Sequence, residues 1–591
     1  CQFPMHEIFL LLFLPLVACL TNYPIVRTSY GAVRGYEYEA SNGFVGEIYK
    51  KIPFASPPTG VRRWKKPEPP EVWNYTMDGT FAGPACAQIE TDRWDGYVTG
   101  FSENCLTLNI YTSKECRESN ATCPVVVYLH GGSLIYSSAV HYPDDTLVVN
   151  YPTQGVIMVT IAYRVGVFGV MALGDENVLP ANLAIHDIME SLRFLRKEVH
   201  AFGGDKDQIS VMGHSIGANL ALFMTYSPAV NKAGEPPLFA RAISISASMN
   251  LFTEEKQISR SHAVATHLGC EGTAAEIVQC LMSFSTAEIL RAASAVGGPD
   301  QNAAMHLNGI TMAGELYPFP DNQKFLANQA EHMKLLAPMP PTKMLIGTIV
   351  DEFRLKILTV NESLNEAIDT LGVQNVDLCY RKYFSDWKSG TFKPEYDTLS
   401  QGILLAASMF GSTHVRAGGE VHLFQFDYPQ HSSHADDFYY LLGVHPFEKD
   451  ENEEWLSRVY PLYFTNFIKG LPPASDWTPL DPDLMNYYSI NKSFTDGVVP
   501  HMKIGYHQPI TDYYVDLMKF DKGMSVTREK FLQAPVQYKK LVLLDDEPRN
   551  LRDFLFYGVV LGVVLYIVFK IIELVNARRT RAEEYARLES Q

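Results

Sequence analysis

The residues best suited to covalent chemistry are a serine and the two glycines around it, in the segment Gly213-His-Ser215-Ile-Gly217. An apolar, β-rich run at 209–212 precedes this segment, and helix-forming residues follow it from Ala218. A Gly-x-Ser-x-Gly between a strand and a helix is the context of a nucleophile elbow, a turn so tight that Cβ atoms beside the serine would collide. We therefore expect Ser215 to be a nucleophile at the carboxyl edge of a sheet, where ligands bind.

A serine nucleophile needs a base, and the base needs an acid that orients it. The acid candidates are two adjacent residues, Asp351 and Glu352, which follow an apolar run. The base candidate is His434, in the loop after a further apolar run, and His431 and His422 are its rivals. Sequence spacing alone does not separate His431 from His434.

A reaction at a carbonyl group also needs N–H donors for the oxyanion that forms. The segment Leu129-His-Gly-Gly-Ser133 matches the His-Gly-Gly type of oxyanion loop, in which glycine lets the backbone approach the substrate. We expect the backbone donors to come from this loop and from the residue directly after Ser215. The candidates are Gly131, Gly132, Ser133 and Ile216.

Strands and helices alternate in the middle of the chain and would position these residues. Short apolar runs that suit a sheet covered on both faces occur at 125–129, 156–161, 209–212 and 242–246. Between the second and third runs, apolar residues recur every three or four positions over 184–201, which predicts an amphipathic helix. This order predicts an α/β fold with a largely parallel sheet. No Gly/Ser-rich linker divides residues 25–520, so we predict one large domain at 21–520.

The composition excludes several classes of function. The 591 residues contain 49 Lys and Arg against 66 Asp and Glu, and 49 − 66 gives a net charge of −17, which argues against a nucleic-acid partner. His431 and His434 with Asp436 and Asp437 could bind a metal. However, no paired Cys-x-x-Cys or His-Glu-x-x-His motif occurs, so we predict no metal and no cofactor.

The two ends of the chain predict a membrane protein. Residues 1–20 contain an apolar run that fits a signal peptide, with a buried strand or helix as the alternative. Residues 554–569 carry no charge, Lys570 interrupts this run, and a basic cluster follows the apolar residues Ile571, Ile572, Leu574 and Val575. These features predict a transmembrane helix at 553–575 after a stalk at 521–552. The expected topology is a single-pass type I protein with a lumenal or extracellular domain and a short cytoplasmic tail at 576–591. A Gly-x-x-x-Gly pair within the predicted helix could support a homodimer.

Cysteines and glycosylation sequons agree with a secreted compartment, where disulfides persist. Proximity along the chain suggests the pairs Cys86–Cys105, Cys116–Cys123 and Cys270–Cys280, which leaves Cys379 unpaired. Four Asn-x-Ser/Thr sequons lie before the predicted membrane helix, at Asn74, Asn120, Asn361 and Asn491.

These motifs together resemble the type-B carboxylesterase/cholinesterase family of α/β-hydrolases, from about residue 26 to about residue 520. The opening Ile52-Pro-Phe-Ala-Ser-Pro-Pro-Thr-Gly60 and the segment Glu103-Asn-Cys-Leu106 are similar to family signatures. The resemblance implies a catalytic triad of Ser215, Glu352 and His434, because His434-Ala-Asp-Asp-Phe-Tyr-Tyr fits the family motif around the histidine. It also implies the pairs Cys86–Cys105 and Cys270–Cys280, but not Cys116–Cys123.

Departures from the family pattern concern specificity more than fold. His214 stands where the family usually has Glu, Ile216 replaces a small residue, and Ser133 replaces a third glycine. Trp94 is a candidate for the residue that stacks on choline, but cholinesterase activity is not expected. The resemblance implies a serine esterase that acts on a small-molecule ester, and the ends of the chain predict that this esterase is anchored in a membrane. The alternatives are a neuroligin-like adhesion protein and an acyltransferase that uses the same triad.

Overall fold

The computed structural model describes residues 23–89, 100–119, 122–227, 230, 236–248, 254–297, 342–353, 373, 375–393, 396 and 398–532. The chain divides into two compact units, Cys1–Asp521 and Lys522–Gln591. The predicted signal peptide and membrane helix lie outside the described residues, as do Trp94, Asn120 and Asn361. Among the helices that are described, none is both long enough and apolar enough to cross a membrane.

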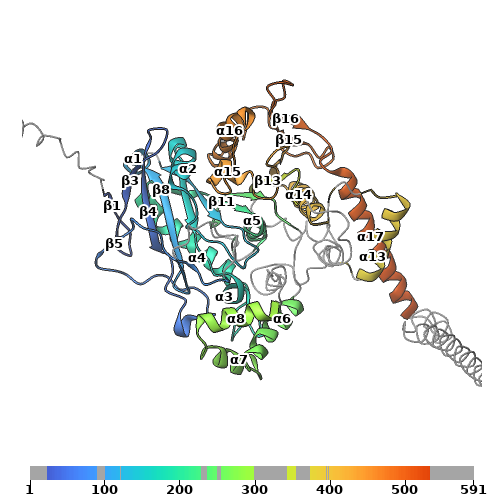
Figure 1. Cartoon of the computed structure of the whole chain (residues 1–591), viewed down its shortest axis with the longest axis horizontal. Helices are drawn as coiled ribbons and strands as arrows, with labels where there is room; N and C mark the ends of the chain where they lie inside the picture. The colour runs from blue at the N-terminus through green and yellow to red at the C-terminus, as the bar shows by residue number, and fades with distance from the viewer. Residues whose placement is uncertain are drawn as a thin grey trace, which may run out of the picture. The chain divides into compact units, whose positions relative to one another are not determined.

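The first unit is built around an eleven-stranded mixed sheet (Figure 1). Its order is β16-β15-β14-β13-β12-β11-β9-β10-β8-β4-β3. Seven consecutive strands, from β15 to β10 in this order, run parallel, while β8, β4, β3 and β16 are antiparallel to their neighbours. The predicted parallel sheet is therefore its centre, and antiparallel strands form both edges. The strands are β3 (Tyr36–Glu39), β4 (Val45–Pro53), β8 (Thr107–Ser113), β9 (Cys123–Leu129), β10 (Ile157–Ile161), β11 (Gly204–His214), β12 (Arg241–Ile245), β13 (Lys343–Ile349), β14 (Glu420–Phe426), β15 (Tyr487–Ile490) and β16 (His501–Lys503).

Helices cover both faces of this sheet, which is why its central strands are apolar throughout. Successive side chains of a strand point to opposite faces, so Val125 and Val127 join one core cluster while Val126 and Tyr128 join another. The first cluster takes in the helices α4 (Leu183–Glu198), α5 (Ile216–Tyr226) and α14 (Thr398–Arg416). The second takes in α2 (Asp144–Asn150), α15 (Phe438–Leu442) and α16 (Glu451–Ile468). The α/β prediction is thus confirmed.

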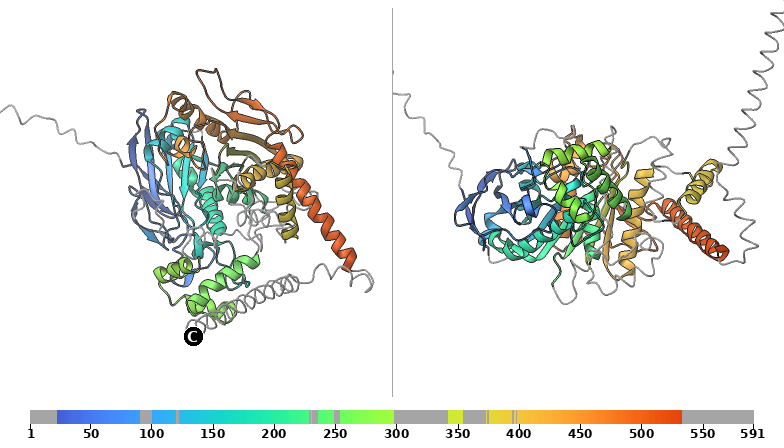
Figure 2. Two further views of the ribbon diagram at one scale, coloured as in Figure 1. Left: turned by 45° about the vertical axis from the view of Figure 1, so that its right-hand side comes forward. Right: turned by 90° about the horizontal axis from the view of Figure 1, so that it is seen from below.

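Two small sheets and a group of helices complete the unit. The small sheets contain β1 (Ile25–Arg27), β2 (Ala32–Arg34) and β5 (Thr76–Asp78), and β6 (Ala85–Cys86) with β7 (Phe101–Ser102). The helices α6 (Glu254–His267), α7 (Ala274–Leu281) and α8 (Thr286–Gly297) share a third core cluster and lie together in Figure 2. The remaining long helices are α13 (Val376–Ser389) and α17 (Gln508–Leu532).

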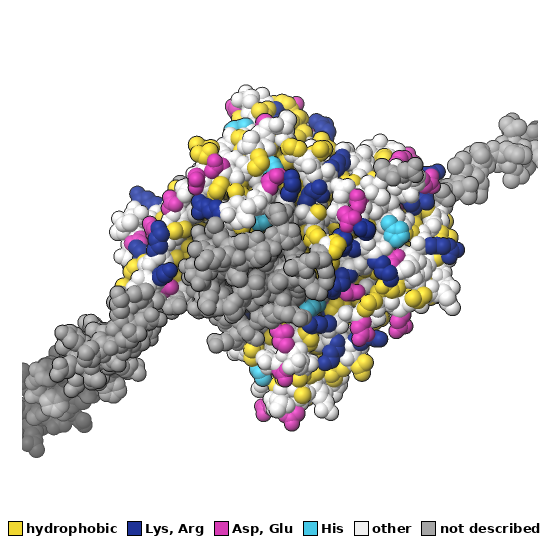
Figure 3. All heavy atoms as spheres, turned by 180° about the vertical axis from the view of Figure 1, so that it is seen from behind, with side chains coloured by type: hydrophobic (Ala, Val, Ile, Leu, Met, Phe, Trp, Pro, Cys, Tyr) yellow, Lys and Arg dark blue, Asp and Glu magenta, His cyan; other side chains and the backbone are white. Residues whose placement is uncertain are grey.

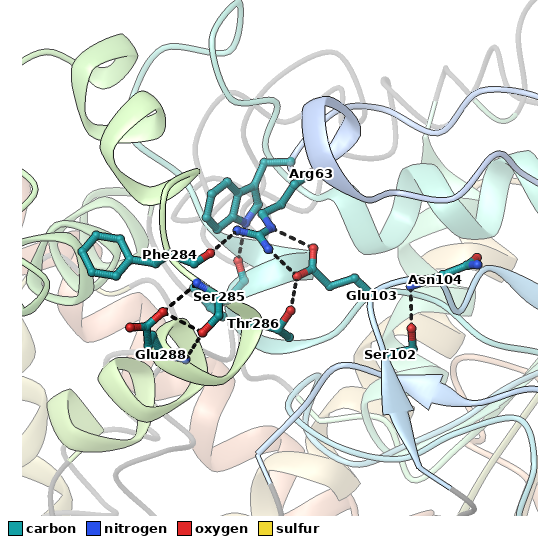
Figure 4. Close-up of polar contacts among 10 residues, drawn as sticks. Arg63, Ser102, Glu103, Asn104, Phe284, Ser285, Thr286 and Glu288 are labelled. Atoms are coloured by element: carbon teal, nitrogen blue, oxygen red, sulfur yellow. Dashed lines mark hydrogen bonds and ion pairs between the residues drawn. The ribbon is translucent and has the colours of Figure 1, made fainter.

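A buried ion pair links the N-terminal segment to α8 (Figure 4). Arg63 Nη2 lies 2.6 Å from Glu103 Oε1, and Arg63 Nη1 donates to the carbonyl of Phe284 at 2.9 Å. Thr286 Oγ1 donates to the same carboxylate. Asn104, which stands where the family has Asp, is exposed and points away from this network (Figure 4). The exchange of Asp for Asn therefore leaves the ion pair intact.

Three disulfides join the cysteine pairs that proximity suggests. They are Cys86–Cys105, Cys116–Cys123 and Cys270–Cys280. Cys379, on α13, is a buried free thiol. Burial, reinforced by Asp521, raises the pKa of this thiol to about 12. The thiol is therefore protonated and unreactive at neutral pH.

Acidic and basic side chains are interspersed over the described surface on the face shown in Figure 3.

Candidate active site

Ser215 occupies a strained turn between β11 and α5. Its backbone has φ 55° and ψ −125°, a combination that an L-residue adopts only where the surrounding structure enforces it. A Cβ atom on Gly213 would lie 2.0 Å from the carbonyl oxygen of Gly217, and one on Gly217 would lie 2.1 Å from that of Leu129. Only glycine fits at either position, so the local sequence enforces the elbow that presents the serine.

The loop after β9 packs against this elbow. A Cβ atom on Gly131 would lie 3.3 Å from the Cβ of Ser215, so the two backbones are in close contact. Gly132 and Ser133 have φ values of +93° and 55°, which turn the loop sharply. Within the described part of the chain, the backbone N–H groups of Gly132, Ser133 and Ile216 have no hydrogen-bond partner. These three groups can therefore act as donors to a substrate oxygen.

His434 and Glu352 form a direct contact in which the glutamate is buried. His434 Nδ1 lies 2.6 Å from Glu352 Oε2, and the backbone N–H of His434 donates to the Glu352 carbonyl at 2.8 Å. The other carboxylate oxygen of Glu352 accepts from the backbone N–H of Ile349 at 3.0 Å. A carboxylate can only accept, so Nδ1 carries the hydrogen and Nε2 keeps a lone pair. This tautomer is the one that a general base requires.

The rival residues lie in other contacts. His431 Nδ1 lies 2.7 Å from Glu453 Oε1, and the imidazole stacks on Phe447. His422 is buried in β14 with its ring against Trp477. Asp351 precedes Glu352, but it is Glu352 that reaches His434. The structure therefore brings Glu352 and His434 together, as the resemblance implies.

Aromatic rings enclose the imidazole of His434. Phe353 stacks on it with a centroid distance of 4.7 Å, and His214 packs at 4.6 Å. Because His214 is the neighbour of Ser215, the histidine and the elbow lie side by side. Among the described residues, no hydrogen bond joins Ser215 to His434. In the absence of substrate such catalytic hydrogen bonds are often long.

His214 contributes a neutral ring to the site. Burial lowers the pKa of His214 well below 6.5, and the neighbouring His434 and His445 lower it further. Its Nε2 is buried and makes no hydrogen bond within the described structure. The side chain next to Ser215 is therefore uncharged.

One contact of the histidine loop was not anticipated as part of the site. Asp437, considered above only as a metal ligand, accepts a hydrogen bond from Tyr460 of α16 at 2.7 Å. The described residues contain no group of three or more His, Cys, Asp or Glu that could hold a metal ion. Tyr460 carries no motif, and only its position in the folded chain reveals its contact.

Two of the predicted glycosylation sites fall within the described residues. Asn74 is exposed, and Asn491 is partly exposed. Both therefore have the surface position that modification requires, while Asn120 and Asn361 lie outside the described residues.

Comparisons with known proteins agree with this geometry. The model of the Carboxylesterase family matches residues 22–508. Gut esterase 1 of Caenorhabditis briggsae is 28% identical, over 84% of this chain and 92% of its own length. Carboxylesterase 1C of Rattus norvegicus is 27% identical, over 77% of this chain and 87% of its own. Juvenile hormone esterase of Tribolium castaneum is 33% identical over a shorter stretch, 48% of this chain and 47% of its own. The chain therefore belongs to the carboxylesterase family, a family of carboxylic ester hydrolases with the α/β-hydrolase fold.

Proposed function

We propose that the protein is a serine carboxylesterase that works through an acyl-enzyme on Ser215. The observation that carries the proposal is the 2.6 Å contact between His434 Nδ1 and Glu352 Oε2, beside a serine in a strained elbow. A base held by a buried carboxylate next to such a serine is the arrangement that activates a hydroxyl nucleophile. Substrate binding would bring the Ser215 hydroxyl into hydrogen-bond distance of His434 Nε2.

In the first half of the reaction, Ser215 Oγ attacks the ester carbonyl carbon while its proton passes to His434 Nε2. Glu352 stabilises the imidazolium that results. The oxyanion accepts hydrogen bonds from the backbone of Gly132, Ser133 and Ile216. Collapse of the tetrahedral intermediate breaks the bond to the alcohol, which leaves with the proton from His434. Water then attacks the acyl-enzyme by the same steps and regenerates Ser215.

Labelling with a fluorophosphonate is the direct test of this proposal. The activated Ser215 is expected to react and peptide mapping by mass spectrometry to find the adduct on the peptide that contains it. Pretreatment with excess ester substrate should slow the labelling, because the acyl group occupies the same oxygen. Absence of an adduct from the folded protein would contradict the proposal and favour the adhesion alternative.

An acyltransferase would share the acyl-enzyme and differ only in the acceptor. Product analysis in a mixture of water and a primary alcohol separates the two activities. We expect the free acid to dominate. Predominant transfer of the acyl group to the alcohol would favour the acyltransferase.

We also propose that the enzyme is anchored in a membrane through residues 553–575, with its catalytic domain lumenal or extracellular. The support comes from the sequence: an apolar segment, the basic residues after it, and sequons confined to the region before it. Alkaline carbonate extraction of membranes from expressing cells should leave the full chain in the pellet. Release of the full chain into the supernatant would count against the anchor.

A further inference from the structure

The loop that carries His434 is attached to a single face of α16 at two points. His431 precedes His434 by three residues and contacts Glu453, while Asp437 follows it by three residues and accepts from Tyr460. Glu453 and Tyr460 are seven residues apart on α16, which is about two turns, so their side chains point to the same side. The catalytic histidine is thus held between two anchoring contacts to one helix.

The second contact is unusual because it buries a carboxyl group. Asp437 is fully buried, its Oδ2 accepts from Tyr460, and its Oδ1 has no hydrogen-bond partner within the described structure. Burying an incompletely bonded carboxylate costs free energy, and an asparagine of nearly the same shape could keep one acceptor for Tyr460 without a charge. A hydrogen bond that only holds the loop on α16 therefore does not require an acid at position 437.

The ionisable groups that face Asp437 connect it to the catalytic pair. They are Tyr460 on α16, Tyr440 on α15, Glu352 after β13, and His434 and Asp436 on the same loop. Burial raises the pKa of the Asp437 carboxyl to about 7. The hydrogen bond from Tyr460 opposes this shift, Glu352 adds to it and His434 opposes it. A change of charge at Asp437 near pH 7 therefore changes the electrostatic stabilisation of charge on His434.

We propose that Asp437 is a positioning residue for His434: Tyr460 fixes its carboxylate, and its negative charge stabilises the imidazolium that forms during catalysis. The inference rests on the proposed function of Ser215, His434 and Glu352. It assigns the residue a role through His434 and not through contact with the substrate.

The proposal predicts opposite pH shifts for two variants. Asp437→Asn removes the anion beside His434, so the imidazolium is less stable and the acidic limb of kcat/KM should move to lower pH, by about half a unit. Tyr460→Phe keeps the carboxyl but removes the donor that favours its charged form, so the pKa of Asp437 rises. In this variant Asp437 can still ionise, but only at higher pH, and the full rate is reached only once it has ionised, so the acidic limb should move to higher pH. Each variant should also lose roughly tenfold in kcat at pH 7, since either change leaves less anion at Asp437.

The matched control is Tyr463→Phe. Tyr463 lies one turn further along α16, and its ring contacts Trp477 and Tyr488 instead of the histidine loop. This variant should keep the wild-type profile. All rates are to be expressed per active site, by fluorophosphonate titration of Ser215, so that a partly unfolded preparation does not alter the result.

Opposite shifts of the two limbs would support the proposal, because a purely structural loss lowers the rate at every pH without moving the limb. Shifts in the same direction, or wild-type limbs in both variants, would overturn it. The proposed function is judged separately by Ser215→Ala. If that variant is inactive while the limbs do not move, only the role of Asp437 fails. If it retains full turnover, both proposals fail.

Discussion

Replacement of Ser215 by alanine is expected to lower kcat for p-nitrophenyl esters by about 10⁶-fold, the order of magnitude seen when other serine hydrolases lose their nucleophile. The variant loses the only oxygen that the elbow presents to the carbonyl, while backbone donors and substrate contacts remain. KM should therefore change little. The measurement is steady-state hydrolysis of a p-nitrophenyl ester, with circular dichroism to show that the variant is folded.

A suitable control for this variant is Ser457→Ala. Ser457 lies on α16, and its hydroxyl donates only to the carbonyl of Glu454. It should retain full turnover. If Ser215→Ala keeps the wild-type turnover after contaminating esterases are excluded, Ser215 is not the nucleophile.

The second large effect is expected from Glu352→Gln, which should reduce kcat by roughly 10³- to 10⁴-fold. The amide lacks the charge that stabilises the imidazolium, and its N–H₂ can face Nδ1 and favour the wrong tautomer of His434. The 2.6 Å contact and the near-complete burial of Glu352 explain why solvent cannot compensate. The measurement is kcat from active-site-titrated enzyme.

Asp351→Asn is the matched control, because it makes the same chemical change one residue earlier. The side chain of Asp351 is only partly buried, and its neighbour makes the contact with His434. Less than a tenfold loss of kcat is expected. A larger loss of kcat in Asp351→Asn than in Glu352→Gln would show that Asp351, and not Glu352, is the acid that supports His434.

Much of the site could be predicted because local sequence determines it. The glycines around Ser215 have no alternative in so tight a turn, and apolar runs mark the strands that end at Leu129, His214 and Ile349. The choice of His434 over His431 needed the family motif, because both histidines precede acidic residues in the same loop. The structure separates them by their partners, Glu352 and Glu453.

Other features depend on tertiary contacts that no local pattern contains. The strand predicted at 209–212 begins at Gly204, which pairs with Cys123 of β9, and the register shifts between Gly204 and Ile209. The edge strand β3 pairs antiparallel with its neighbour β4, and the mixed polar and apolar residues of both strands give no continuous apolar run. The contact of Tyr460 with Asp437 joins residues 23 positions apart through the packing of α15 on α16. Such contacts become visible only when the helices are placed.

The buried thiol of Cys379 can be used to measure how often the native protein unfolds locally. All other cysteines within the described residues are in disulfides, so under non-reducing conditions this thiol is the one group there that an alkylating reagent can modify. Because its pKa is raised and its side chain has no access to solvent, modification requires a local or global unfolding event that exposes α13. The rate at which Cys379 is alkylated then reports how often this part of the native protein opens, and no cysteine has to be introduced for the measurement.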